Sequence, residues 1–267
     1  MRSEIKLTAI IKDTVRKSIL DYAERSLHKK AKFQILDLII PKERKIRSIV
    51  GGLETSLGTT LWEPLAKALA KNNGFLVKEE NLEAPANMPA NLGNVLANII
   101  SERERRSGVY DAEKSHVEIR ETCQIFQNSR RIEMFVPAPK GYGVDIWLVK
   151  DGINYFFDTK TVQPNLGAFT NCMKQVLHWY AYFYCKHPDE RAEARIVFPY
   201  NPHRIDFWDG SIAQGLPLEK NKEGWVENEF WNFCSGHNDT YLLIKNSFKE
   251  LHESKELEYD LERLLAR

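Results

Sequence analysis

One stretch of this sequence, residues 144–161, reads VDIWLVKDGINYFFDTKT. Two apolar runs flank the pair Asp151-Gly152, which is the strongest short-range signal for a β-hairpin. Asp145 lies near the start of the first run and Asp158 at the end of the second, so the hairpin brings both carboxylates to one end. Residues two apart on a strand share a face, and Lys160 therefore joins Asp158.

Two acids and an amine around one point are suited to hydrolysis of a phosphodiester. The reaction needs a cation to offset negative charge and a positioned water, and Mg²⁺ prefers oxygen ligands. Asp145, Asp158 and the backbone carbonyl of Thr159 can supply those oxygens, while Lys160 can orient or deprotonate the water. The same D-x-K triplet also occurs at ordinary exposed strand ends, and the spacing alone leaves both interpretations open.

The composition indicates a globular protein. The chain has 267 residues, of which 43% are hydrophobic, and this suits one large domain. No apolar run is long enough to span a membrane, and Met1 opens a charged segment rather than a signal peptide. The four cysteines form no C-x-x-C pair, so neither a disulfide framework nor a zinc site is indicated. We expect a soluble, cytoplasmic protein with no membrane partner.

Positive charge is concentrated near the N-terminus. Residues 1–50 hold thirteen Lys and Arg against six Asp and Glu, a balance of +7, so the rest of the chain carries −6 of the total of +1. A basic segment of this kind is compatible with contacts to phosphates. It is equally compatible with an ordinary solvated helix face.

The spacing of apolar residues gives the order of elements. Helices are predicted over residues 5–27, 58–71, 92–105, 111–127, 167–185, 238–252 and 255–266. Strands besides the hairpin are predicted near 75–77, 132–136 and 195–200, with a loop over 81–94 and an irregular region over 208–228. This order predicts an α/β (α+β) fold in which helices flank a central mixed β-sheet.

The pattern D-x12-D-x-K on a hairpin resembles the PD-(D/E)XK nuclease superfamily, with Val144 where a proline often precedes the first acid. Further motifs resemble type II restriction endonucleases of the TdeIII group; they lie at residues 156–165, 198–202, 229–233 and 240–241. The resemblance covers roughly residues 50–250. It implies one endonuclease domain over 1–267, with a basic helical extension at 1–50, a catalytic core at 51–250 and a C-terminal helix at 251–267.

The resemblance also implies an activity. It is Mg²⁺-dependent cleavage of double-stranded DNA at a short palindrome of GGNCC type, leaving 5′-phosphate ends. Asp145, Asp158 and Lys160 would be catalytic, and Asp145, Asp158 and Thr159 would hold the metal. Because a palindrome matches a two-fold symmetric enzyme, a homodimer is expected. A cognate DNA methyltransferase is expected in the same system, but not as a stable partner.

Members of the superfamily commonly place a glutamate on the helix before the core hairpin. Glu63, in the opening turn of the helix predicted over 58–71, is the preferred candidate for this catalytic support, and Glu54 is the alternative. An acid in a first helical turn is also explained by the helix dipole alone.

Several polar residues are candidates for DNA contact. Thr161, Gln163 and Asn165 follow the lysine, although turn chemistry before the next helix explains them as well. Lys174, with Gln175, can reach a phosphate or lie on an exposed helix face. His203 and Arg204 are candidates for reading guanine. Two other functions remain open: a repair or recombination nuclease that reads DNA structure, and a non-catalytic DNA-binding module.

Overall fold

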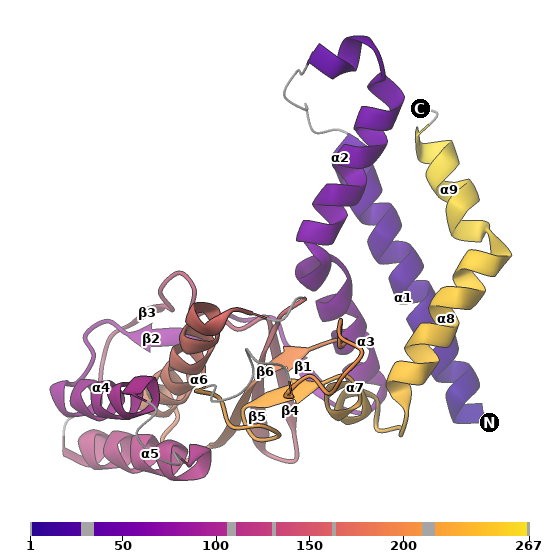
Figure 1. Ribbon diagram of the computed structural model, residues 1–267. Helices are drawn as coiled ribbons and strands as arrows, with labels where there is room; N and C mark the ends of the chain where they lie inside the picture. The colour runs from indigo at the N-terminus through magenta and orange to yellow at the C-terminus, as the bar shows by residue number, and fades with distance from the viewer. Residues whose placement is uncertain are drawn as a thin grey trace. The chain divides into compact units, whose positions relative to one another are not determined.

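The computed structural model describes residues 2–27, 35–105, 111–129, 132–161, 164–209 and 217–265 (Figure 1). The chain divides into two compact units: Met1–Asn73 with Trp231–Arg267, and Gly74–Phe230. These boundaries differ from the division expected at residues 50 and 250, and the single endonuclease domain stays a prediction.

The second unit is built around a five-stranded sheet in the order β1-β4-β5-β6-β7 (Figure 1). The first three strands pair antiparallel, whereas β5, β6 and β7 pair parallel. This is the mixed sheet flanked by helices that the sequence predicts. The strands are β1 (Leu76–Lys78), β4 (Ile146–Lys150), β5 (Ile153–Thr159), β6 (Arg191–Phe198) and β7 (Gly224–Val226).

The hairpin of β4 and β5 forms as predicted. Its turn residues both have positive φ, 52° at Asp151 and 72° at Gly152, as a two-residue type I′ turn requires. Ile146 pairs with Phe157, and this register runs to the turn without interruption. The ends of the two apolar runs therefore come together.

Helix α6 (Leu166–Lys186) is the centre of the core in this unit. Its buried face includes Met173, Leu177 and Trp179, which pack with Phe156 of β5. The helix also contacts α4, α5 and β2, and β2 pairs antiparallel with β3. These elements are α4 (Ala90–Arg105), α5 (Ala112–Ser129), β2 (Glu83–Pro85) and β3 (Phe135–Pro137).

The first unit is helical. Helix α1 buries Leu7, Ile11 and Val15 and packs against α3, α8 and α9. The helices of this unit are α1 (Arg2–Leu27), the short 3₁₀ helix Ile35–Leu38, α2 (Pro41–Thr55), the short π-helix Gly58–Trp62, α3 (Glu63–Asn72), α8 (Thr240–Ser254) and α9 (Glu256–Leu265). Helix α7 (Asn228–Ser235) contains the boundary between the two units.

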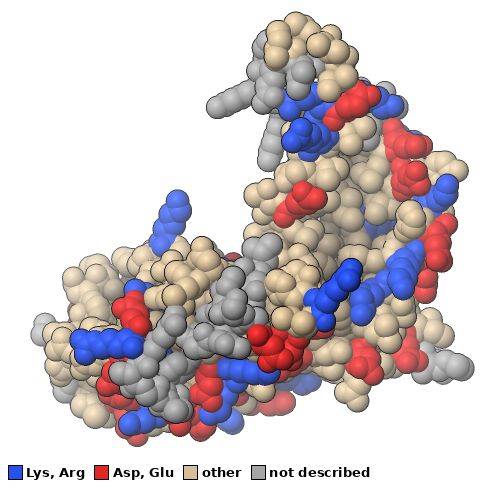
Figure 2. All heavy atoms as spheres, in the orientation of Figure 1, with Lys and Arg blue, Asp and Glu red and all other residues tan. Residues whose placement is uncertain are grey.

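The basic N-terminal segment is partly neutralised within the first unit. Arg16 pairs with Asp260 at 2.5 Å, and Lys12 pairs with Glu250 at 2.7 Å. In the view of Figure 2, basic and acidic side chains are interspersed over the helices rather than gathered into one continuous basic face. This arrangement agrees with the interpretation as a solvated helix face.

The predicted helices all form, with ends within three residues of those expected. The exception is the helix predicted over 58–71, whose first five residues form a π-helix before α3 begins. Two three-residue strands lie where no strand is expected: β2 in the expected loop, and β7 in the expected irregular region. Helices α2 and α7 were not predicted individually. No helix in the described ranges is long and apolar enough to cross a membrane.

The turn of the hairpin gives a stability prediction. Gly152→Ala places a side chain at a positive φ and should lower the free energy of unfolding by about 1 kcal/mol. No atom lies within 4 Å of a Cβ built at Gly152, so a steric clash does not contribute. Gly143→Ala is the matched control, because it also meets no atom and has no positive φ. Equal denaturant midpoints for the two variants would contradict the turn assignment.

Candidate active site

The backbone of the hairpin places the Asp145 carboxylate beside the end of β5. The Asp145 amide donates to the Phe157 carbonyl at 3.1 Å, which extends the pairing one residue before β4. The Thr159 amide then donates to Asp145 Oδ2 at 3.1 Å. Asp145 is therefore held at the strand end that carries Asp158.

Asp158 and Lys160 form an ion pair at the same strand end. Lys160 Nζ lies 2.5 Å from Asp158 Oδ2, and Asp158 is only 5% exposed. The Lys160 amide donates to the Val197 carbonyl of β6 at 2.9 Å, so the residue is fixed beyond the last paired position of β5. Asp145, Asp158 and Lys160 thus come together as the spacing predicts.

Burial alone would lower the pKa of Lys160, but the Asp158 carboxylate and its hydrogen bond outweigh burial, and Asp145 adds to them. The net pKa is raised above the ordinary 10.5, so the ammonium stays charged at neutral pH. A charged ammonium can offset negative charge and orient a water.

Helix α6 holds the segment before Asp145 by two side-chain hydrogen bonds. Gln175 Nε2 donates to the Gly143 carbonyl at 3.2 Å, and Trp179 Nε1 donates to the Tyr142 carbonyl at 2.9 Å. These bonds anchor the segment that leads into Asp145. Gln175, expected as a phosphate contact or on an exposed helix face, is instead buried, and its amide is bonded to the Gly143 carbonyl.

The buried Cys172 side chain of α6 forms part of the surroundings of Lys160. Burial raises the pKa of Cys172 to about 12, so the thiol is uncharged at neutral pH. It contributes an apolar wall rather than a nucleophile.

The donor set is suited to a hard divalent cation. Asp145 and Asp158 supply carboxylate oxygens, and the Thr159 carbonyl belongs to the same strand end. Mg²⁺ typically takes one or two protein carboxylates and completes its coordination with water and substrate oxygens. Over the described ranges, no group of three or more His, Cys, Asp or Glu side chains is arranged to hold a metal. The two-carboxylate set nevertheless fits the ligand requirement of Mg²⁺.

The remaining candidates fall into different environments. Thr161 directly follows Lys160 and is half-buried, whereas Gln163 lies outside the described residues. Asn165 caps α6, because its Oδ1 accepts from the Ala168 amide at 2.9 Å. This capping supports the turn interpretation of Asn165.

Lys174 is held by an ion pair with Glu104, at 2.6 Å. His203 and Arg204 lie on an exposed loop that begins after β6. This loop leaves the sheet at the strand end where Val197 pairs with Thr159. Any contact of these residues with DNA stays a prediction.

Glu63 is the first residue of α3, and Glu54 is an exposed residue of α2. Both belong to the first unit, while Asp145, Asp158 and Lys160 belong to the second. The role of either glutamate at the metal site therefore stays a prediction.

Comparison with known proteins gives a family. The family described as "Type II restriction endonuclease, HinfI" matches residues 3–252. The type II restriction enzyme MjaII of Methanocaldococcus jannaschii is 23% identical over 202 residues, which are 72% of this chain and 51% of MjaII. The chain thus spans about half the length of this curated relative. No solved structure gives a significant match.

The predicted resemblance to type II restriction endonucleases is confirmed, although the matching family is named for HinfI and not for the TdeIII group. The match covers nearly the whole chain, including the hairpin and both of its flanking helical regions. This chain belongs to the HinfI family of type II restriction endonucleases.

Proposed function

We propose that this protein is a Mg²⁺-dependent endonuclease that cuts both strands of DNA at a short palindrome. Asp145, Asp158 and Lys160 are its catalytic residues. The observation that carries the proposal is their convergence: Thr159 N bonds Asp145 Oδ2 at 3.1 Å while Lys160 Nζ bonds Asp158 Oδ2 at 2.5 Å. The restriction-endonuclease family supplies the substrate class, double-stranded DNA.

Each residue has a distinct function in this proposal. Asp145 and Asp158 would hold Mg²⁺ together with the Thr159 carbonyl. The bound ion would supply positive charge to the scissile phosphate and lower the pKa of a bound water. The Lys160 ammonium offsets the negative charge that develops on the phosphate oxygens and orients the attacking water. Departure of the 3′ oxygen leaves the phosphate on the 5′ end.

The recognition sequence proposed is of the GGNCC type, which rests on the resemblance to the TdeIII group. A palindrome presents the same bases to two symmetry-related subunits, so we propose a homodimer with one site for each strand. Thr161, Gln163, Asn165, Lys174, His203 and Arg204 are the proposed DNA contacts, and Glu63 the proposed support of the metal site. A methyltransferase of the same system would protect the host sites without binding this protein stably.

Removal of any one of the three side chains should strongly slow cutting. Asp145→Ala, Asp158→Ala and Lys160→Ala should each reduce the cleavage rate by about 10²–10⁴-fold. DNA binding, measured by gel shift in Ca²⁺, should remain largely in place, because most of the binding surface is unchanged. Asp189→Ala is the control, since Asp189 is an exposed carboxylate of the same unit. Full Mg²⁺-dependent cutting by any of the three variants would remove that residue from the site.

A charge-conserving variant separates the two possible functions of Lys160. If the residue acts by its charge, Lys160→Arg should cut measurably faster than Lys160→Gln under single-turnover conditions. Arginine keeps the positive charge but does not deprotonate in proteins. Rates that are equally low in both variants would instead favour a proton-accepting lysine.

The whole proposal is tested by incubation of the protein with a long duplex of known sequence and Mg²⁺, followed by mapping of the fragment ends. Discrete double-strand cuts at one palindrome, 5′-phosphate ends and sedimentation as a dimer are expected. A chelator should stop cutting, and Ca²⁺ should support binding without turnover. Cutting only at flaps, junctions or free ends would show a structure-specific nuclease. Binding with no cutting in any divalent ion would show a non-catalytic module.

A further inference from the structure

Helix α2 of the first unit has an apolar stripe that is only partly covered. Its apolar residues Ile46, Ile49, Val50 and Leu53 follow the i, i+3, i+4, i+7 spacing of a helix that packs on a neighbour. Yet α2, which the structure describes throughout, buries none of its fifteen residues. A helix of this length gains most of its stability from the packing of such a stripe. The described residues do not provide that packing, so α2 calls for a partner.

The exposed apolar surface continues into the residues before α2. Among the described residues, sixteen large apolar side chains are exposed, and six of them lie between residues 35 and 50. We call these six the α2 face: Ile35, Leu38, Ile39, Ile40, Ile46 and Val50. A concentration of exposed apolar side chains is typical of an interaction surface, whereas single exposed ones are ordinary.

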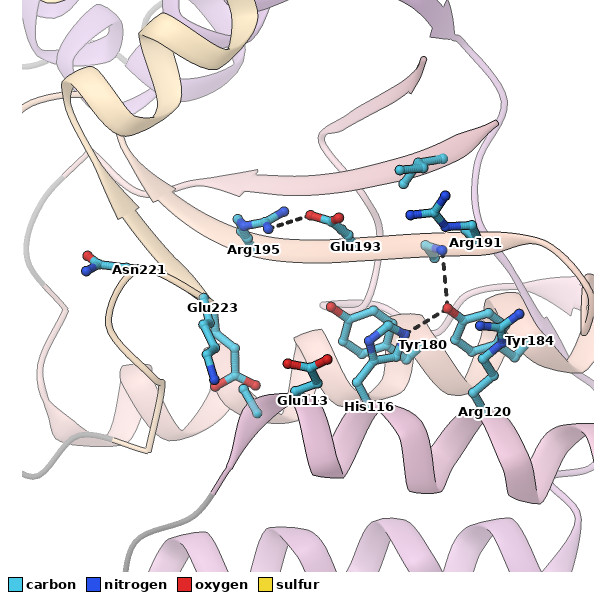
Figure 3. Close-up of a pocket in the computed structure, with 14 residues that line it drawn as sticks. Glu113, His116, Arg120, Tyr180, Tyr184, Arg191, Glu193, Arg195, Asn221 and Glu223 are labelled. Carbon is cyan, nitrogen blue, oxygen red and sulfur yellow. Dashed lines mark hydrogen bonds and ion pairs between the residues drawn. The ribbon is translucent and has the colours of Figure 1, made fainter. Parts of the chain in front are cut away.

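Helix α5 of the second unit shows how an amphipathic helix is covered when its partner lies in the same chain. It packs on α6, and Ile119 and Cys123 on its inner side are buried. Figure 3 shows His116 of α5 beside Tyr180 and Tyr184 of α6, and the His116 ring stacks on the Tyr180 ring at a centroid distance of 4.0 Å. The α2 face has no such second layer among the described residues.

An apolar groove of ≈ 600 Å³ lies beside α2 in the same unit. Helix α1 runs between α2 and α9 and contacts α2, α8 and α9 (Figure 1). All four helices line the groove. Its apolar lining consists of Val15 and Ile19 of α1, Ile46 of α2, Phe248 and Leu251 of α8, and Leu257 and Leu261 of α9. A groove of this kind can receive the apolar side chains of another helix.

The helices on the two sides of the groove have opposite charge. Helix α2 has four basic residues and two acidic ones, whereas α9 has four acidic residues and one basic residue. Glu258 and Glu262 of α9 line the groove, and Lys42, Lys45 and Arg47 of α2 are exposed. The first unit therefore presents a basic helix with an apolar stripe, and beside it an apolar groove with acidic residues at one side.

We propose that this surface binds a second copy of the chain, with α2 of each copy in the groove of the other. A two-fold pair needs a surface that is complementary to itself. Here each apolar stripe meets an apolar groove, and each basic α2 meets an acidic α9. The inference rests on the proposed function for its partner, the second subunit of the proposed homodimer. It adds the surface that joins the two subunits.

The size of the surface suits a stable dimer. A standard interface between proteins uses roughly 20–30 residues on each side. Helices α2 and α9 have 15 and 10 residues, and residues 35–40 and the groove-lining residues of α1 and α8 add to them. When one side of each helix takes part, the surface reaches the lower end of that range.

Two other occupants fit this surface less well. A basic amphipathic helix also suits an anionic membrane surface, and its charges suit the DNA backbone. Either would bring negative charge close to the acidic side of the groove, which like charges disfavour. A second copy brings a basic α2 to the same place.

The test is sedimentation velocity of the full chain without DNA or Mg²⁺, so its result is independent of cutting. The unaltered protein should form a dimer at micromolar concentration. Val50→Asp and Ile39→Asp should each raise the dissociation constant of the dimer about tenfold or more, because each places a charge in an apolar contact. Circular dichroism checks that each variant is folded.

Helix α5 offers matched controls for both substitutions. Val117 is 44% exposed against 48% for Val50, and Ile125 is 70% exposed against 74% for Ile39. Val117→Asp and Ile125→Asp should leave the dissociation constant unchanged, since both residues lie in the second unit.

Reversal of charge tests the pairing of α2 with α9. The double variant Lys42→Glu/Lys45→Glu should weaken the dimer, and so should Glu258→Lys/Glu262→Lys, because each places like charges together. The chain with all four substitutions should recover part of the lost affinity, since opposite charges then face each other again. A merely structural defect would not be recovered in this way.

Four results would overturn the inference. A protein that stays monomeric at its highest soluble concentration would show that no second copy binds. A dimer unchanged by Val50→Asp and Ile39→Asp would place the contact elsewhere, as would a dimer that the α5 controls disrupt equally. Charge reversal on α2 that weakens binding to DNA or to anionic lipid vesicles, but leaves the dimer intact, would assign α2 to that other occupant.

Failure of this inference can be told apart from failure of the proposed function. Site-specific cutting by a protein whose dimer does not depend on α2 would leave the proposed function standing and refute the surface alone. A dimer that depends on α2, in a protein that cuts no DNA, would support the surface and remove the proposed function.

Discussion

The arrangement of the candidate site depends on the register of one hairpin. With Ile146 opposite Phe157, Asp145 reaches the Thr159 amide and Asp158 lies at the same strand end. A slip of one residue would turn every side chain of a strand to the opposite face of the sheet. It would then move Asp158 and Lys160 away from their present face together, and the ion pair would no longer lie beside Asp145. The positive-φ turn is therefore a condition for the convergence of these three residues as well as for the fold.

Other elements of the second unit hold the residues of the candidate site in place around this hairpin. Parallel pairing with β6 holds the lysine backbone, and α6 binds the segment before Asp145 through Gln175 and Trp179. Asn165, five residues beyond Lys160, is the N-terminal capping residue of this helix. Two carboxylates with like charge are thus held close by backbone hydrogen bonds and by the ammonium of Lys160. The stability of the scaffold compensates for the repulsion between them.

The hairpin and the convergence of Asp145, Asp158 and Lys160 could be predicted because their signals are local: a turn pair, alternating apolar residues and a fixed spacing. β2 and β7 could not, because each is three residues long and is defined by a distant partner strand. The burial of Gln175 likewise depends on a distant partner, the Gly143 carbonyl.

The first unit is made from both ends of the chain, and this affects how the protein folds during synthesis. Residues 74–230 are contiguous and can fold as soon as they are made, but α1 packs against α8 and α9, which follow residue 239. At the roughly 5–20 residues per second of translation, α1 waits on the order of ten to forty seconds for its partners. During that interval its apolar side chains, Leu7, Ile11 and Val15 among them, are without their final cover. Nascent chains of this protein are therefore expected to be substrates for chaperones that bind early N-terminal segments.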